Sequence, residues 1–273
     1  MKNSQTRKLK KSIKYGDVFR IGNHVLGCGD ACDAEFVKRV ISKTKIKLIL
    51  SDPPYGVMVV ESKLGFSELK MNKKILNDDI VTEEQYAKFT HNWLSPAIPF
   101  LTQRNSIYIF NSDKMIFALR DGMIHSGVKF SQLLIWIKNH SVIGRKDYLP
   151  AHELIAFGWY GTHDFKKAKD KSVLFYPKPN RSPLHPTQKP VGLLRRLILN
   201  STNINDTVYD CFAGSGSTGI AAEQTKRSSI LIERDEEYCQ TIINRFEKIF
   251  KLKAQKITYE KRKNTKTSTR TAS

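Results

Sequence analysis

The sequence predicts an α/β fold in which helices cover both faces of a doubly wound, mostly parallel sheet. Three observations support this prediction. Strand and helix patterns alternate along residues 18–250 at the spacing of β-α-β units. The apolar run Ile46–Leu50 is typical of a strand that is buried on both faces. A Gly-x-Gly-x-x-Gly turn, from Gly214 to Gly219, joins a strand to a helix.

Runs of β-branched and aromatic residues predict seven strands, at 25–29, 46–50, 105–110, 132–137, 153–157, 207–210 and 229–232. Apolar residues spaced three and four apart predict the helices, at 35–42, 82–101, 115–125 and 190–198, from the glycine turn to 224, and at 235–250. Thr82, with Gln85 three positions later, is expected to cap the second helix. Pro96 and Pro99 predict that this helix ends irregularly.

The composition is strongly basic, with a formal net charge of +20 over 273 residues. Residues 1–14 contain six Lys or Arg and no acid, and residues 251–273 contain eight against one Glu. We therefore expect a basic arm at 1–17, one domain at 18–250 and a basic tail at 251–273. Positive charge on the body and at both ends favours a polyanionic partner such as DNA.

Two other classes of protein are not indicated. No apolar stretch approaches the roughly 20 residues that span a bilayer, and the basic N-terminus lacks the apolar core of a signal peptide, so we expect a cytoplasmic protein. The four cysteines do not suggest a disulfide framework. Cys28 and Cys32 have no matching Cys/His pair, so no metal site is expected.

The residues after the strand Ile46–Leu50 are Ser51-Asp52-Pro53-Pro54-Tyr55. The prolines end the strand, which leaves a carboxylate, a fixed turn and an aromatic ring at its carboxyl end. In open α/β sheets, ligands bind at that edge.

These residue types suit methylation of an exocyclic amine, whose lone pair is delocalised into the base ring. Asp52 and the Pro53 carbonyl would accept hydrogen bonds from the amine and free its lone pair, with little reorganisation of the rigid turn. Tyr55 offers a face for stacking an extruded base. With an ordinary pKa of about 3.9, Asp52 would take a proton only from the cationic methylated product. An ordinary Asp-Pro turn is the alternative interpretation of this motif.

The second motif predicts a nucleoside-bearing cofactor. The strand ending at Asp210 leads into the glycine turn and a helix, and the next strand ends at Glu233, at the position of a carboxylate that binds ribose hydroxyls. Too little chain follows Gly219 for the second half of a dinucleotide fold, and the turn lacks the Gly-Lys-Ser/Thr of a P-loop.

A third motif, His185–Pro190, precedes a helix that Pro190 is suited to begin. Lys189 lies at the mouth of this helix, where the helix dipole disfavours a cation. We expect an exposed lysine that is available for a carboxylate, and this mild conflict favours a ligand role over an ordinary surface lysine.

Taken together, residues 18–250 resemble the β class of DNA amino-methyltransferases, in which an Asp-Pro-Pro-Tyr half precedes the cofactor half. Asp52–Tyr55, His185–Pro190 and Asp210–Gly216 carry the resemblance. Cys211 departs from it, because the family commonly has proline there. The resemblance implies a Rossmann-like, seven-stranded fold that binds S-adenosylmethionine and no metal.

The resemblance also implies roles for individual residues. Lys189 and Thr187 would meet the methionine carboxylate, Glu233 the ribose, and Asp30 would line the cofactor pocket. The expected catalytic residues are Asp52, Pro53, Pro54 and Tyr55, and the expected cofactor-binding residues are Asp30, Thr187, Lys189, Asp210, Phe212, Gly214, Ser215, Gly216 and Glu233. The segment 147–153 is also similar to a family segment near the flipped base.

Asp at position 52 is similar to the adenine enzymes, whereas the cytosine-N4 enzymes usually carry Ser. We therefore predict N6-adenine methylation of duplex DNA by base flipping. The alternatives are cytosine-N4 methylation, an RNA or protein-glutamine methyltransferase, and a basic DNA-binding protein with a vestigial site. A homodimer, a cognate restriction endonuclease and a bacterial or phage origin are further hypotheses.

Two segments are candidates for reading the DNA sequence. Residues 56–75 form a long Lys-, Ser- and Gly-containing stretch directly after the Asp52 motif. Residues 159–184 interleave aromatic with basic side chains, a composition typical of nucleic-acid contacts and also of an ordinary solvated insertion.

Overall fold

The structure is a computed structural model that describes residues 13–55, 82–141, 147–166, 170–177 and 189–259. In this part of the chain the α-helices are α1 (Ala34–Ile41), α2 (Glu83–Leu94), α3 (Ile116–His125), α4 (Val191–Ser201), α5 (Ser217–Gln224) and α6 (Glu236–Phe250). A 3-10 helix, η2 (Ser95–Phe100), follows α2 directly. No helix among these described ranges is both long and apolar enough to cross a membrane.

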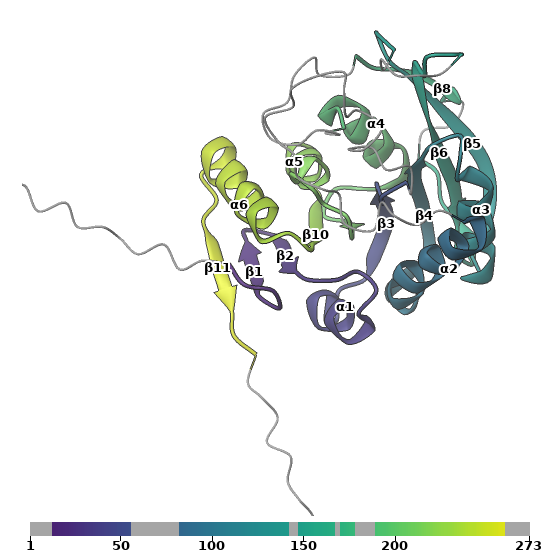
Figure 1. Ribbon diagram of the computed structural model, residues 1–273. Helices are drawn as coiled ribbons and strands as arrows, with labels where there is room; N and C mark the ends of the chain where they lie inside the picture. Colours follow the sequence, from purple (N-terminus) through teal and green to yellow (C-terminus); the bar gives the residue numbers. More distant parts are fainter. Residues whose placement is uncertain (1–12, 56–81, 142–146, 167–169, 178–188, 260–273) are drawn as a thin grey trace, which may run out of the picture.

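The strands form one twisted sheet. They are β1 (Val18–Ile21), β2 (His24–Cys28), β3 (Ile46–Ser51), β4 (Leu101–Asn111), β5 (Lys129–Ile137), β6 (His152–Trp159), β7 (Thr162–His163), β8 (Val173–Phe175), β9 (Thr207–Asp210), β10 (Ser228–Glu233) and β11 (Ala254–Ile257). Their order is β11-β1-β2-β10-β9-β3-β4-β6-β5-β8, and β7 pairs with β4. Figure 1 shows the layers: α1, α2 and α3 cover one face of the sheet, and α4, α5 and α6 cover the other.

The α/β class, the helices on both faces and the mostly parallel sheet are confirmed. The expected number of seven strands is wrong, because the described residues alone contribute eleven strands to the sheet. The strand predicted at 25–29 is β2, and it pairs antiparallel with a strand that was not predicted, β1. The short strands β7 and β8 lie within the predicted insertion.

The predicted basic tail at 251–273 also begins inside the fold. Its residues Ala254–Ile257 pair antiparallel with β1. Lys256 contacts Asp17, with 2.6 Å between Nζ and Oδ1. The edge strand β1 offers unpaired backbone groups, and pairing with β11 satisfies them although the segment is rich in lysine.

The helix boundaries follow local signals. Thr82 caps α2 as expected, and its hydroxyl accepts a hydrogen bond from the backbone N–H of Gln85. The helix ends at Leu94 and not near residue 101, because Pro96 and Pro99 impose the tighter 3-10 geometry of η2.

The sheet topology brings the predicted motifs together. Strand β9 lies between β10 and β3 and is parallel to both, with Ile49 of β3 level with Tyr209 of β9. The residues after β3 and after β9 therefore lie side by side at one edge, which we call the carboxyl edge; the opposite one is the amino edge. Strand β6 runs antiparallel to β4, with Leu154 opposite Asn111, so β6 begins at the carboxyl edge.

Candidate active site

The ends of β3 and β9 are joined by side-chain hydrogen bonds. The Ser51 hydroxyl donates to Asp210 Oδ1 over 3.1 Å, and the backbone N–H of Cys211 donates to Ser51 Oγ over 3.2 Å. Asp210 Oδ1 also accepts from the backbone N–H of Phe212. These contacts fix the start of the Asp-Pro-Pro-Tyr turn against the start of the glycine turn.

The Asp-Pro-Pro-Tyr turn is held from the α2 side as well. The Tyr86 hydroxyl donates to the Pro54 carbonyl over 2.9 Å, and Asn111 Nδ2 donates to the Tyr86 oxygen over 2.9 Å. Tyr86 and Asn111 are both fully buried. The buried face of α2 and the end of β4 therefore fix the orientation of this turn before any ligand arrives.

Both oxygens of Asp52 are occupied. Oδ1 accepts from the Tyr55 hydroxyl over 2.6 Å, and Oδ2 accepts from the Lys189 ammonium over 2.5 Å. The Tyr55 oxygen also lies 3.0 Å from Glu153 Oε2. Since a hydroxyl carries one hydrogen, Tyr55 donates to only one of the two carboxylates at a time.

Glu153 completes a cluster of two carboxylates and two ammonium groups. Its Oε2 lies 3.1 Å from Lys189 Nζ, and its Oε1 lies 2.8 Å from Lys138 Nζ. The expectation of an exposed Lys189 is wrong: the residue is only 6% exposed, because its ammonium turns inward between Asp52 and Glu153. The carboxylates that it contacts belong to the protein itself.

Burial and charge act in opposite directions on these groups. Burial raises the pKa of Asp52 above its ordinary value, against the opposing charge of Lys189. Burial would also raise the pKa of Glu153, but the charges of Lys189 and Lys138 outweigh it and hold that pKa low. Glu153 is therefore the firmly ionised partner of Lys189, whereas Asp52 takes up a proton more readily.

The glycine turn after β9 forms the neighbouring part of the site. Gly214 and Gly216 have φ values of +52° and +82°, which favour glycine. A Cβ on Gly216 would also lie 2.9 Å from Ile242 of α6. The backbone N–H of Gly214 donates to Glu233 Oε2 over 2.7 Å, so the turn and the end of β10 are in direct contact.

Two carboxyl groups beside this turn are protonated more readily than usual. Burial raises the pKa of Glu233 to about 7, against hydrogen bonds from the backbone N–H groups of Asp235 and Gly214. Burial likewise raises the pKa of Asp210 to about 6. Burial therefore destabilises the ionised form of both carboxyl groups. Hydrogen-bond donors from a polar ligand would offset that destabilisation.

The other predicted cofactor residues surround the same turn. Asp30 accepts from the backbone N–H of Cys32 and lies 3.5 Å from Arg234, next to Glu233 in sequence. The Phe212 ring packs edge-on against Trp93 with 5.3 Å between centroids. Ser215 is buried, and its carbonyl accepts from Arg245 of α6. Thr187 lies outside the described residues.

Several residues of the site were not assigned from the sequence. Tyr86, Asn111, Lys138 and Arg245 carry no motif, and Glu153 was noted only as part of the segment 147–153. Glu153 reaches the site because β6 is antiparallel, so its first residues, and not its last, lie at the carboxyl edge. Within the described part of the chain, no group of His, Cys, Asp or Glu side chains could hold a metal ion.

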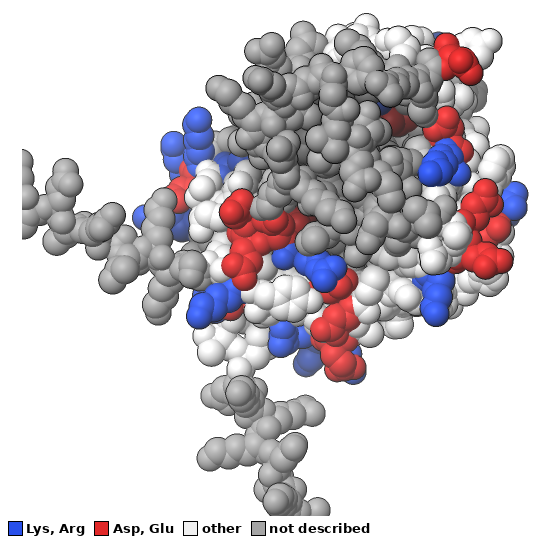
Figure 2. All heavy atoms as spheres, in the orientation of Figure 1, with Lys and Arg blue, Asp and Glu red and all other residues white. Residues whose placement is uncertain are grey.

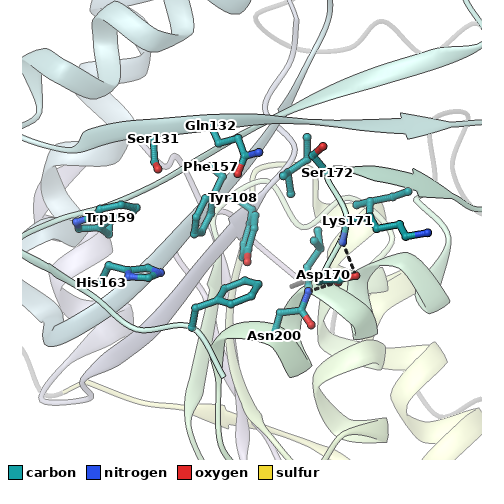
Figure 3. A pocket seen from close by; sticks show the side chains of 14 residues that line it. Tyr108, Ser131, Gln132, Phe157, Trp159, His163, Asp170, Lys171, Ser172 and Asn200 are labelled. Carbon is teal, nitrogen blue, oxygen red and sulfur yellow. Dashed lines mark hydrogen bonds between the residues drawn. The ribbon is translucent and has the colours of Figure 1, made fainter. Parts of the chain in front are cut away.

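A cavity of about 290 Å³ lies elsewhere, between the sheet and the end of α4. Figure 3 shows Tyr108, Phe157, Trp159 and His163 around it. Trp159 ends β6, so this side of the cavity belongs to the amino edge, away from Asp52. The polar groups beside it serve the fold: Asp170 accepts from Arg196 and Asn200 of α4.

This placement bears on the candidate DNA segment 159–184. Trp159 packs on His163 with 4.5 Å between ring centroids, and Asp164 binds Lys47 near the start of β3 with 2.7 Å between Oδ2 and Nζ. Residues 159–166 thus fasten the chain to the amino edge. Trp159, His163 and Asp164 therefore have a structural use there.

Comparisons with known proteins identify the family. Residues 46–245 match the family model described as DNA methylase, which covers the N6 and N4 enzymes, and the match includes both motifs. The chain belongs to the N6/N4 DNA methylase family. Among curated relatives, the methylase is 26% identical over 236 residues to the type II methyltransferase M.HpaI of Haemophilus parainfluenzae, over 77% of this chain and 71% of that protein. It is 30% identical to M.HinfI of Haemophilus influenzae, over 77% and 66%.

Solved structures share the fold of the methylase. The M1.HpyAVI–SAM complex is 26% identical, with a TM-score of 0.60 over 81% of this chain and 98% of that one. The cytosine-N4-specific PvuII DNA methyltransferase has a TM-score of 0.64 at 16% identity, over 82% and 86%, which is a likeness of fold alone.

We predict that Tyr86→Phe lowers the single-turnover rate of DNA methylation about 10-fold, because the Pro54 carbonyl loses its donor and the turn loosens. The variant also loses the hydrogen bond from Asn111 Nδ2 to the Tyr86 oxygen, so two buried hydrogen bonds are lost, at about 1–3 kcal/mol of unfolding free energy. The matched control is Tyr108→Phe, whose hydroxyl is bonded to Ser201 beside the cavity. It should keep the wild-type rate although it also loses a buried hydrogen bond. Equal rates for the two variants would contradict a positioning role for Tyr86.

A second prediction concerns the pH dependence of stability in the ligand-free methylase. The pKa of Glu233 is about 7 in the folded chain against 4.5 for an ordinary glutamate, so the folded state binds more protons between these values. Wild type should therefore lose stability relative to Glu233→Gln as the pH rises from about 4.5 to about 7, by on the order of 2 kcal/mol. Denaturant unfolding at several pH values measures this.

The matched control for that measurement is Glu84→Gln, at an exposed position in the first turn of α2. It should follow the wild-type pH profile. A Glu233→Gln profile parallel to wild type across the whole window would show that Glu233 is not strained as an anion.

Proposed function

We propose that this methylase transfers a methyl group from S-adenosylmethionine to the N6 amine of an adenine in duplex DNA, after the base has been flipped out. The observation that carries the proposal is the contact between the two motifs: Ser51, next to Asp52, is hydrogen-bonded to Asp210 at the start of the glycine turn. An acceptor for an amine and a site for a nucleoside are thereby adjacent.

The residues around the glycine turn fit the cofactor. Gly214 and Gly216 leave no side chain over the backbone, and Glu233 presents a carboxyl group whose raised pKa favours partners that donate hydrogen bonds, as ribose hydroxyls do. Asp30, Phe212 and Ser215 border the same turn. S-adenosylmethionine, when bound, supplies an electrophilic methyl group. The assignment of Thr187 and Lys189 to its carboxylate stays a prediction from the family resemblance.

The catalytic residues act on the target amine. Asp52 and the Pro53 carbonyl accept its hydrogens, which localises the lone pair on nitrogen, and the Tyr55 ring stacks on the base. Tyr86 holds the turn in place through Pro54. After transfer the methylated amine is cationic and acidic, and Asp52 is the group beside it that can take up the proton.

Adenine is proposed over cytosine because an Asp and not a Ser stands at position 52.

Duplex DNA must approach the carboxyl edge, and this leaves 56–75 as the favoured segment for reading the DNA sequence. That segment lies outside the described residues. On the described surface in Figure 2, acidic and basic side chains are interspersed, so that surface carries no continuous basic patch. The homodimer and the partner restriction endonuclease stay predictions.

The test is a methylation assay with nucleoside mass spectrometry. Wild type should form N6-methyladenine in duplex DNA, and Asp52→Asn should lower the rate about 10²-fold or more while keeping DNA and cofactor affinity, because the proton acceptor is lost. Asp121→Asn, at a half-exposed position on α3 beside Arg120, is the matched control and should behave as wild type. N4-methylcytosine as the product would replace the adenine proposal, and no product from any wild-type preparation would support a vestigial site.

A further inference from the structure

Lys189 and Asp52 form a donor–acceptor pair at the place where the target base must bind. The Lys189 ammonium lies 2.5 Å from Asp52 Oδ2, and it is largely buried with a side-chain exposure of 6%. An ammonium group has three hydrogens. Among the described residues, its hydrogen bonds go to Asp52 and Glu153, which leaves one hydrogen for a further acceptor.

The bases differ in the edge that they present to such a pair. In adenine and in cytosine, the amino group stands next to a ring nitrogen that carries no hydrogen, so a donor and an acceptor are adjacent. In guanine and thymine the neighbouring groups of that edge are a carbonyl and a ring N–H, the reverse order. An acceptor and a donor side by side in the protein therefore complement the first two bases and not the other two.

We propose that Lys189 reads the target base, donating to the ring nitrogen beside the amine while Asp52 accepts from the amine itself. Glu153 positions Lys189 for this contact. The inference rests on the proposed function and deepens it, since it assigns base recognition to a residue that the family resemblance places on the cofactor.

Glu153 is suited to keep Lys189 in place during turnover. When the target amine donates a hydrogen bond to Asp52, the contact between Asp52 and Lys189 weakens. The Lys189 ammonium then needs another anion, and Glu153 Oε2 lies 3.1 Å from Lys189 Nζ. Lys138 binds the other oxygen of Glu153 over 2.8 Å, so the four charged groups balance. A balanced buried cluster avoids the large cost of an isolated charge.

Two aromatic rings lie close to the ammonium group of Lys189. Lys189 Nζ lies 5.4 Å from the Tyr55 ring centroid and 5.2 Å from that of Phe110. Tyr55 is the ring proposed to stack on the base. The donor thus stands within reach of the edge of any base that stacks on Tyr55 and presents its amine to Asp52.

The experiment compares duplexes whose target adenine is intact, is 1-deazaadenine or is 7-deazaadenine, each with wild type and with Lys189→Met. In 1-deazaadenine a C–H replaces the ring nitrogen next to the amine. Wild type should lose about 10–100-fold in kcat/KM on that base, because a hydrogen bond to a charged donor is lost. It should methylate 7-deazaadenine nearly as well as adenine.

For Lys189→Met, adenine and 1-deazaadenine should differ less than about threefold, because the donor is already absent. The control variant is Lys138→Met, because, in the described part of the chain, Lys138 contacts Glu153 and no contact with Asp52 is seen. This variant should keep the wild-type ratio of kcat/KM between adenine and 1-deazaadenine. If Lys189→Met fails to fold, Lys189→Arg retains a donor and should keep most of the wild-type ratio.

Three results would overturn the inference. The first is that wild type methylates 1-deazaadenine with the same kcat/KM as adenine, which would exclude a hydrogen bond to the ring nitrogen without any variant. Alternatively, Lys189→Met could keep the full wild-type ratio, or it could lose only cofactor affinity, as expected for a residue that binds the methionine carboxylate. If wild type forms N4-methylcytosine, 3-deazacytosine replaces 1-deazaadenine in the same design. Absence of product on every unmodified duplex would overturn the proposed function itself, and with it this inference.

Discussion

The hydrogen bond between Ser51 and Asp210 is the contact on which the rest of the site depends. Ser51 is the last residue of β3 and Asp210 the last of β9, and 3.1 Å separate the two oxygens. Pairing of β3 with β9 places the Asp-Pro-Pro-Tyr turn beside the glycine turn, and this hydrogen bond fixes the two turns against each other. With it, residues about 160 positions apart in the chain act as one site. Burial raises the pKa of Asp210 to about 6, so this link is itself sensitive to acid.

The second constraint is the neutral cluster behind the turn. Two carboxylates and two ammonium groups share a largely enclosed space, and their contacts decide which of them holds a proton. The two lysines hold Glu153 ionised, whereas burial makes Asp52 the more basic carboxylate. A base with an amino group thus meets Asp52, which can accept a proton at the end of the reaction. The Lys189 ammonium next to it stays in place because Glu153 remains ionised.

The sequence predicted the parts of the site that depend on order along the chain. The Asp52 motif, the glycine turn and Glu233 each follow a strand, and the carboxyl ends of parallel strands meet at one edge. The Thr82 cap was predictable because it needs only residues three apart. The contacts of Lys189 were not, because they depend on β6 being antiparallel, and no pattern within 152–159 reveals the direction of a neighbouring strand. Strand β11 was missed for a similar reason: pairing with an edge strand uses backbone groups, which a lysine-rich composition conceals.

The central claim is that the two motifs bring a methyl donor and a base amine together at Asp52. The most direct measurement is a crystal structure of the methylase with a duplex that contains its target site and a cofactor analogue in which a carbon bearing an amino group replaces the methylated sulfur. The account predicts that the exocyclic nitrogen of the flipped base is hydrogen-bonded to Asp52 and lies about 3–3.5 Å from the atom that stands for the methyl carbon. A flipped base held away from Asp52, or a separation more than about twice that distance, would contradict it.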